Sequence, residues 1–121
     1  MAPVIHSLFA EIPVELPEEL NQILLKTPQL RIERILSAGQ ASPEDFWYDQ
    51  TQAEWVMLLQ GQARLSFADA ESVELYPGDY LLIPPHCKHR VDWTTPHQVS
   101  IWLAVHIDAA SITEILNDAG D

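Results

Sequence analysis

Cysteine and basic residues are scarce in this chain of 121 residues. The single cysteine, Cys87, cannot form an internal disulfide, which excludes a disulfide framework and fits a reducing compartment. Only 6 lysines and arginines stand against 18 aspartates and glutamates, so the formal net charge is −12. This charge repels phosphate backbones and anionic lipid surfaces, so we expect no nucleic acid and no membrane among the partners.

Long apolar runs are also missing. No segment approaches the roughly 20 apolar residues that a membrane helix needs. The N-terminal sequence MAPVIHSLFAEIP has neither a basic run nor an apolar signal-peptide core, so we expect a cytoplasmic protein. The absence of a Gly-rich phosphate loop, a serine elbow and a Cys-x-x-Cys pair disfavours nucleotide hydrolysis and serine hydrolase chemistry.

What the chain has instead is a regular spacing of its apolar residues. Leu16, Leu20, Ile23 and Leu24 recur at helical spacing and, with Pro17 near the start, predict one short helix between residues 15 and 27. The period then becomes two and predicts strands at 30–36, 46–48, 54–59, 63–67, 73–75, 80–83, 89–93 and 99–106. Short strands separated by turn residues indicate an all-β sandwich or closed barrel.

The chain has room for one domain. We expect an N-terminal arm and short helix over residues 1–28, packed on a barrel of residues 29–108, with a tail at 109–121. In the tail, Ser111 and Glu114 form a possible capping box, which predicts a helical turn as far as Asn117.

Two segments resemble the paired motifs of the cupin superfamily, over roughly residues 42–106. The second motif, G-x5-P-x-G-x2-H, is matched by Gly78, Pro84 and His89, with His86 in place of the inner glycine. The first, H-x-H-x(3,4)-E-x6-G, is matched only by Glu54 and Gly61. Its two histidine positions hold instead Trp47 and Asp49.

The chain is similar to small single-domain bacterial cupins. This resemblance implies a double-stranded β-helix, the jelly-roll barrel, which commonly pairs as a homodimer. It also implies a divalent metal held by histidines and a glutamate, of which Glu54 and His89 carry over directly. Asp49 stands at a histidine position, so a site of one histidine and two carboxylates is a further expectation, and it would favour manganese, magnesium or iron(II) over copper. The expected cofactor is a divalent ion of iron, manganese, nickel or zinc.

Each candidate ligand also has a structural alternative. Glu54 shares a strand face with apolar residues and either contacts a metal or substrate or pairs with Arg34 or Arg90. His89 is either a ligand or a hydrogen-bonded core histidine. Asp49 is either a ligand or the cap of a turn. His86 is a weaker candidate from the loop after two prolines, where the alternative is a surface histidine, and His106 is a weaker candidate from another wall.

A pocket for a small molecule is predicted around Arg34, Tyr48, Gln50, Trp93 and Trp102. Arg34 interrupts an apolar strand face, where its guanidinium suits a carboxylate or phosphate, unless a bulge or a salt bridge with Glu54 occupies it. The tryptophans suit a planar or apolar ligand.

Three functions fit these residues. The first is a metal-dependent dioxygenase or isomerase, the second a sensor that binds a small metabolite without turnover, and the third a metal-free barrel that serves in assembly. The fold alone does not choose between them.

Overall fold

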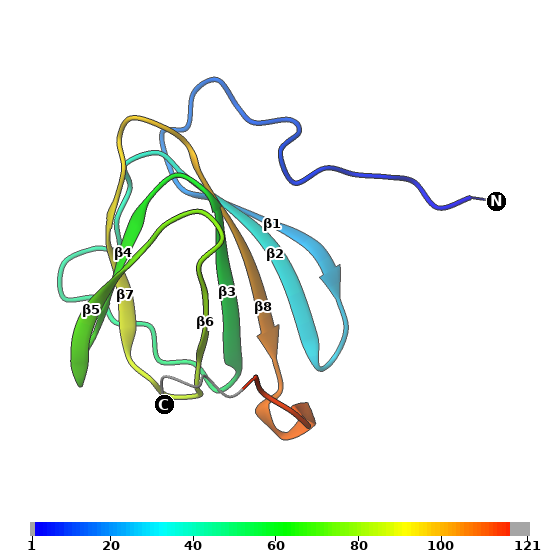
Figure 1. Cartoon of the computed structure of the whole chain (residues 1–121), viewed down its shortest axis with the longest axis vertical. Helices are drawn as coiled ribbons and strands as arrows, with labels where there is room; N and C mark the ends of the chain where they lie inside the picture. Colours follow the sequence, from blue (N-terminus) through cyan, green and yellow to red (C-terminus); the bar gives the residue numbers. More distant parts are fainter. Residues whose placement is uncertain (1, 117–121) are drawn as a thin grey trace.

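The computed structural model describes residues 2–116, and almost all of its regular structure is antiparallel β-strand (Figure 1). The elements in chain order are β1 (Leu20–Lys26), β2 (Leu30–Ser37), β3 (Ala53–Gln60), β4 (Ala63–Phe67), β5 (Ala70–Leu75), β6 (Tyr80–Ile83), β7 (His89–Thr94), β8 (Ser100–Ile107) and the 3-10 turn η1 (Ala109–Ser111). Within the described residues no helix is long and apolar enough to cross a membrane.

The strands form two sheets that face each other (Figure 1). One has five strands in the order β1-β2-β8-β3-β6, and the other has three in the order β5-β4-β7. The neighbours β2 and β8 are distant in sequence, as are β3 and β8, so the chain winds back across itself and closes a jelly-roll barrel. The predicted all-β barrel is therefore confirmed.

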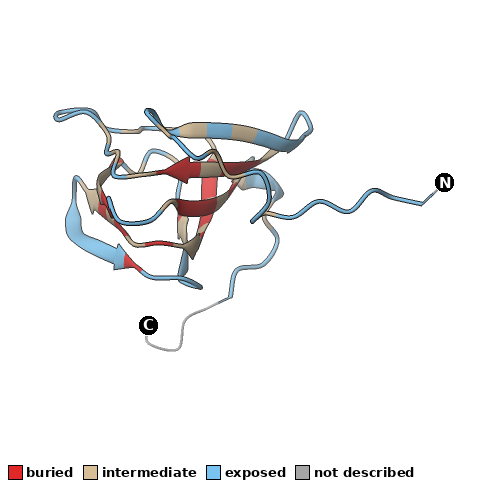
Figure 2. Ribbon diagram, turned by 90° about the horizontal axis from the view of Figure 1, so that it is seen from above, coloured by how far each residue is buried: buried red, intermediate tan, exposed pale blue. Residues whose placement is uncertain are grey.

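The core fills the space between the sheets. Leu58 and Ala63 are fully buried, and Leu65, Ile83 and Trp102 have at most 3% of their surface exposed. Figure 2 shows the buried segments on the strands inside the barrel, with β5 and the N-terminal arm largely exposed. Alternating inward residues therefore supply the core, as expected of half-buried strands.

The expected N-terminal helix is wrong. Leu20–Lys26 is the edge strand β1, which pairs antiparallel with β2 and places Leu20 opposite Leu36. The register shifts between Ile23 and Leu25, so a local irregularity breaks the alternation and imitates helical spacing. The apolar residues from Ile23 to Leu25 are all at least half exposed, so they do not form a face buried against the barrel. Backbone pairing with β2 decides the structure.

Two smaller expectations also need correction. Residues 46–48 form no strand, and only an isolated bridge joins Tyr48 to His89. The tail contains a 3-10 turn over residues 109–111, without a side-chain cap, and residues 112–116 are not helical. Asn117, where the expected turn ends, lies outside the described residues.

The two faces of β2 have separate roles. Arg34 is 5% exposed and binds the N-terminal arm, donating hydrogen bonds to the backbone oxygens of Leu8 and Ala10 and to Gln22. Figure 1 shows the chain before this anchor projecting away from the barrel. The face that carries Arg34 is therefore covered by the arm, and the opposite face of β2 turns inward.

Candidate functional site

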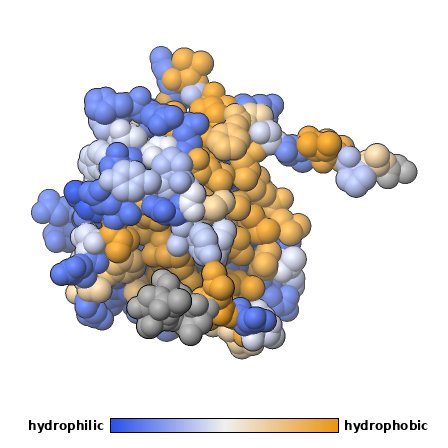
Figure 3. Space-filling model, viewed as in Figure 1, coloured by the Kyte–Doolittle hydropathy of each residue, from blue (hydrophilic) through white to orange (hydrophobic). Residues whose placement is uncertain are grey.

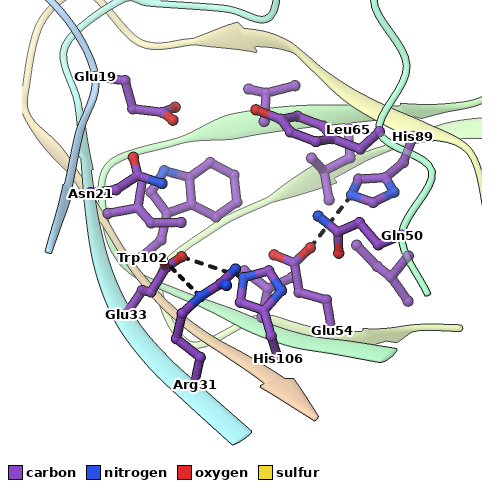
Figure 4. Close-up of a pocket in the computed structure, with 15 residues that line it drawn as sticks. Glu19, Asn21, Arg31, Glu33, Gln50, Glu54, Leu65, His89, Trp102 and His106 are labelled. Carbon is purple, nitrogen blue, oxygen red and sulfur yellow. Dashed lines mark ion pairs between the residues drawn. The ribbon is translucent and has the colours of Figure 1, made fainter. Parts of the chain in front are cut away.

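A cavity of about 160 Å³ lies between the two sheets. Figure 4 shows its polar side chains converging from both walls. On one side they come from β1, β2 and the residue before β1, namely Glu19, Asn21, Arg31 and Glu33. His106 and Glu54 continue this wall from β8 and β3 of the same sheet, while His89 comes from β7 of the other sheet and Tyr48 and Gln50 from the loop before β3. The floor is apolar and includes Val56, Leu65, Ile83 and Trp102. A small apolar cavity with a few convergent polar groups is the usual form of a ligand site.

His89 and Glu54 meet inside this cavity. Their Nε2 and Oε1 atoms are 3.5 Å apart, and each residue is at most 9% exposed. The other ring nitrogen of His89, Nδ1, donates to the backbone oxygen of Cys87 at 2.8 Å, which directs Nε2 toward Glu54. Burial lowers the pKa of His89, but the hydrogen bonds to Glu54 and Cys87 outweigh it and hold that pKa above its ordinary 6.5.

A second histidine and glutamate pair stands nearby. His106 Nε2 lies 3.4 Å from Glu33 Oε1, and both side chains are buried. The other oxygen of Glu33 lies 3.1 Å from Nε of Arg31, which stands opposite His106 in the pairing of β2 with β8. Glu33 is thus shared by two basic groups (Figure 4).

The mouth of the cavity has a negative field. Glu19 is exposed at this rim, where partial burial and the charges of Glu33 and Glu54 raise its pKa, although a hydrogen bond from Ser37 opposes them. Tyr48 experiences the same field, because burial and the nearby carboxylates raise the pKa of its phenol. Its ring stacks on His89 with the centroids 5.5 Å apart. Burial is the main cause of both shifts, and the nearby carboxylates add to each of them.

Trp102 presents an unsatisfied donor at this site. The residue is 3% exposed and lines the cavity, and its Nε1 has no hydrogen-bond partner among the described residues. Figure 4 shows the indole ring among the polar side chains. A buried N–H without an acceptor costs about 1–3 kcal/mol, so a ligand oxygen or a water at this position would be favourable.

Of the five expected metal ligands, Glu54, His89 and His106 line the cavity and Asp49 and His86 do not. Asp49 and His86 contact each other at the surface, with Oδ1 and Nδ1 2.8 Å apart, and both are exposed and absent from the cavity lining. Glu54 and His89 do meet, but residues 2–116 contain no group of three or more histidine, cysteine, aspartate or glutamate side chains able to hold one ion. The donor set therefore does not fit the three or more ligands a transition metal needs.

The expected ion pair of Glu54 with Arg34 or Arg90 is not found among the described residues. Its partner is His89, because Arg34 binds the N-terminal arm and Arg90 donates to the backbone oxygens of Ser42 and Pro43.

Of the five residues predicted for the pocket, Tyr48, Gln50 and Trp102 line the cavity. Arg34 and Trp93 do not. Arg34 faces the arm. The pairing of β4 with β7 shifts register between Arg64 and Leu65, which places an extra residue between Val91 and Trp93 and removes Trp93 from the inward phase.

Sequence reasoning missed four polar residues, Glu19, Asn21, Arg31 and Glu33. Arg31, Glu33 and Ile35 alternate with the apolar residues of β2, so a signal was present. The prediction places the face of Leu30, Ile32 and Leu36 inside the barrel, whereas the arm covers that face.

Comparisons with known proteins agree on the family. The sequence profile described as "Cupin domain" matches residues 33–106. A crystal structure from Ralstonia eutropha JMP134, described as a candidate mannose-6-phosphate isomerase, is 49% identical with a TM-score of 0.84, and the match covers 88% of this chain and 100% of that one. No curated protein matches.

More distant structures agree in fold. A cupin superfamily protein from Desulfitobacterium hafniense DCB-2 is 21% identical with a TM-score of 0.67, covering 79% of this chain and 83% of that one. An RmlC-like cupin with a double-stranded β-helix from Methanocaldococcus jannaschii is 15% identical with a TM-score of 0.63, covering 80% and 86%. The profile spans more than half of the chain and the first relative nearly all of it, so the chain belongs to the cupin family.

Proposed function

We propose that the barrel cavity binds a small organic molecule and that His89 with Glu54 exchanges a proton with it. The observation that carries this proposal is the presence of two buried histidine and glutamate pairs, His89 with Glu54 and His106 with Glu33, on one cavity. A histidine held through Nδ1 and paired with a carboxylate through Nε2 has the arrangement of a general acid or base. Burial lowers the pKa of this histidine, but the hydrogen bonds to Glu54 and Cys87 hold it above the ordinary 6.5.

The reaction this arrangement suits best is an isomerisation, in which a proton leaves one carbon and returns to its neighbour. Two basic groups on one cavity meet the need for a group that removes the proton and another that returns it. The Ralstonia relative is described as a candidate sugar-phosphate isomerase, which is in line with this class of reaction. The chemistry proposed here uses side chains of this chain alone and no step passes through a metal.

The test combines binding and exchange. Wild-type protein and the Glu54→Gln and His89→Gln variants are screened against small metabolites by thermal shift, with and without iron, manganese, nickel and zinc. Hits are then incubated in D₂O and followed by NMR. We expect ligands that stabilise the wild type without metal and that exchange a C–H proton only when both residues are intact.

Two results would contradict this proposal. If stabilisation requires about one equivalent of a divalent metal, the site belongs to the metal-dependent class. If ligands bind without any exchange, the chain is a metabolite-binding cupin without turnover.

A second copy of the chain is the protein partner we propose. Between the outer face of the five-stranded sheet and the tail after η1 lies a groove whose lining, among residues 2–116, has a single charged residue, Glu114, in a chain of net charge −12. Trp55, Tyr80 and Val105 contribute to this groove, and Figure 3 shows a broad hydrophobic surface on this side of the barrel. Because copies of so acidic a chain repel each other, they would meet at a face poor in charge.

Light scattering tests this partner. Tyr80 is 50% exposed, so Tyr80→Glu should leave the fold intact and convert a dimer into monomers. Val73→Glu, at a position 39% exposed on the other sheet, should leave the dimer unchanged. A monomeric wild type would overturn the proposal.

A further inference from the structure

The charges around the cavity are unbalanced. Three carboxylates line it, from Glu19, Glu33 and Glu54, whereas Arg31 is its only permanently charged base among the described residues. Arg31 already stands 3.1 Å from Glu33, and each histidine faces a glutamate. The carboxylates therefore outnumber the permanent cation, although the Nε of Arg31 makes no hydrogen bond within the described residues. Glu19 has no basic partner among the ion pairs of the described residues.

Burial is the main cause of the raised pKa values of Glu19 and Tyr48, and nearby carboxylates contribute to the shift in each case. The chain as a whole carries a net charge of −12, which extends this field beyond the mouth. A phosphate, with up to two negative charges, would enter against the field, whereas a cation would be drawn in.

The remaining walls suit an ammonium ion that also has an oxygen. Tyr48 and Trp102 provide aromatic surfaces, which attract cations electrostatically. The buried Nε1 of Trp102 is a donor without an acceptor, so it calls for an oxygen on the ligand and not for a second N–H. The cavity volume of about 160 Å³ is below the roughly 300–1,000 Å³ of drug-sized ligand sites, so the cavity suits a small ligand.

We propose that the cavity selects small organic ammonium ions that also carry a hydroxyl or carbonyl oxygen, and that it disfavours carboxylate and phosphate ligands. This inference rests on the proposed function, since it names the class of molecule that the same cavity takes. It also separates this chain from the substrate in the description of its Ralstonia relative, because a hexose phosphate combines a larger body with the disfavoured charge.

Two matched series of probes test the selectivity. Ethanolamine, ethylene glycol and glycolate have nearly the same size and differ in charge. Mannosamine, mannose and mannose-6-phosphate repeat the comparison on a larger frame. Binding is followed by the indole N–H signals in ¹⁵N NMR spectra, with the signal of Trp102 assigned by Trp102→Phe. We expect the ammonium compound of each series to bind most tightly and to move the Trp102 signal, while the anion binds least.

Charge variants give effects of opposite sign. Glu19→Gln removes the unpaired rim carboxylate and should weaken ethanolamine binding by about two- to fivefold, the range of an exposed ion pair. Glu18→Gln, which changes an exposed neighbour outside the cavity lining, should have no effect. Arg31→Gln removes the fixed cation and should tighten ethanolamine binding while weakening any binding of glycolate.

Several results would overturn the inference. These are tighter binding of an anion than of its ammonium counterpart, equal effects of Glu18→Gln and Glu19→Gln, a Trp102 signal that manganese or magnesium moves and amines do not, and no response to any amine. The proposed function is judged separately. If anionic or neutral metabolites stabilise the wild type and lose this effect in Glu54→Gln, the function stands and only the charge selectivity fails.

Discussion

His89 and Glu54 belong to opposite sheets of the barrel, yet their side chains meet at 3.5 Å in its interior. His89 begins β7 of the three-stranded sheet, and Glu54 is the second residue of β3 in the five-stranded sheet. The pair therefore joins the two walls of the cavity through a polar contact in addition to the apolar core. Its protonation state should be detectable in both the chemistry and the stability of the protein.

The first prediction concerns the pKa of His89. In Glu54→Gln the charged acceptor is lost while burial remains, so the pKa of His89 should fall from above 6.5 to below it. Titration of the imidazole signals by NMR measures this change. Glu33→Gln is the matched control, because Glu33 pairs with His106 instead and should leave His89 nearly unchanged. If the pKa of His89 is the same in Glu54→Gln as in the wild type, the pair does not exist in solution.

The second prediction is the effect of this pair on stability. Because the folded pKa of His89 is raised, the stabilisation is fully present below the unfolded value of 6.5 and is lost as the pH rises through the folded pKa. The difference in unfolding free energy between wild type and Glu54→Gln should therefore be larger at about pH 6 than at about pH 8. Urea denaturation at both values measures it. A difference that grows with pH would contradict the assignment.

The third prediction concerns the anchor of the N-terminal arm. Arg34→Met keeps much of the side-chain volume but removes the donors to Leu8 and Ala10, leaving those carbonyls without their charged partner. We expect a loss of about 2–3 kcal/mol and faster proteolysis of the arm. Arg64→Met is the control, since its ion pair with Asp92 is 41% exposed on the arginine side and should contribute less than about 1 kcal/mol. Equal losses in the two variants would show that the arm is not held by Arg34.

The fourth prediction compares two glycines with nearly the same backbone conformation. Gly61 has φ +94° and Gly78 has φ +95°. A Cβ at Gly61 would approach Cα of Ser100 to 2.7 Å, whereas a Cβ at Gly78 would meet nothing within 4 Å. Gly78→Ala should therefore cost only the backbone strain, about 1–2 kcal/mol, and Gly61→Ala should cost more than that because the β3–β4 turn must move away from β8. Thermal unfolding of the two variants tests the order, which a similar loss in both would contradict.

The sequence predicted most of the barrel because alternation and turn residues are local signals. The bounds of β4 and β6 agree with the expected strands, and those of β2, β3, β7 and β8 differ by a residue or so. The strand β1 was missed because its pairing with β2 and its register shift depend on tertiary contacts. Propensity and periodicity do not carry that information.

The candidate site was predicted in part for a related reason. The motif positions Glu54 and His89 lie in the cavity, and so does His106. Asp49 matched a ligand position by spacing alone, but its side chain lies at the surface, where it contacts His86. Arg31 and Glu33 were not predicted as site residues because both faces of β2 are covered, one by the barrel and one by the arm. Hydrophobicity therefore does not distinguish the inner face from the outer one.

Because consecutive residues of β2 face opposite sides, Glu33 belongs to the cavity and Arg34 to the arm. Point substitutions can therefore change one side without the other. During divergence, positions 31, 33 and 35 are free to alter which ligand is taken, while 34 and 36 preserve the shape of the molecule. An insertion or deletion of a single residue within β2 would exchange the two faces beyond that point. Such a shift can bring the guanidinium of Arg34 into the cavity and take the carboxylate of Glu33 out of it. We expect relatives of this chain to vary in the composition of this strand far more freely than in its length.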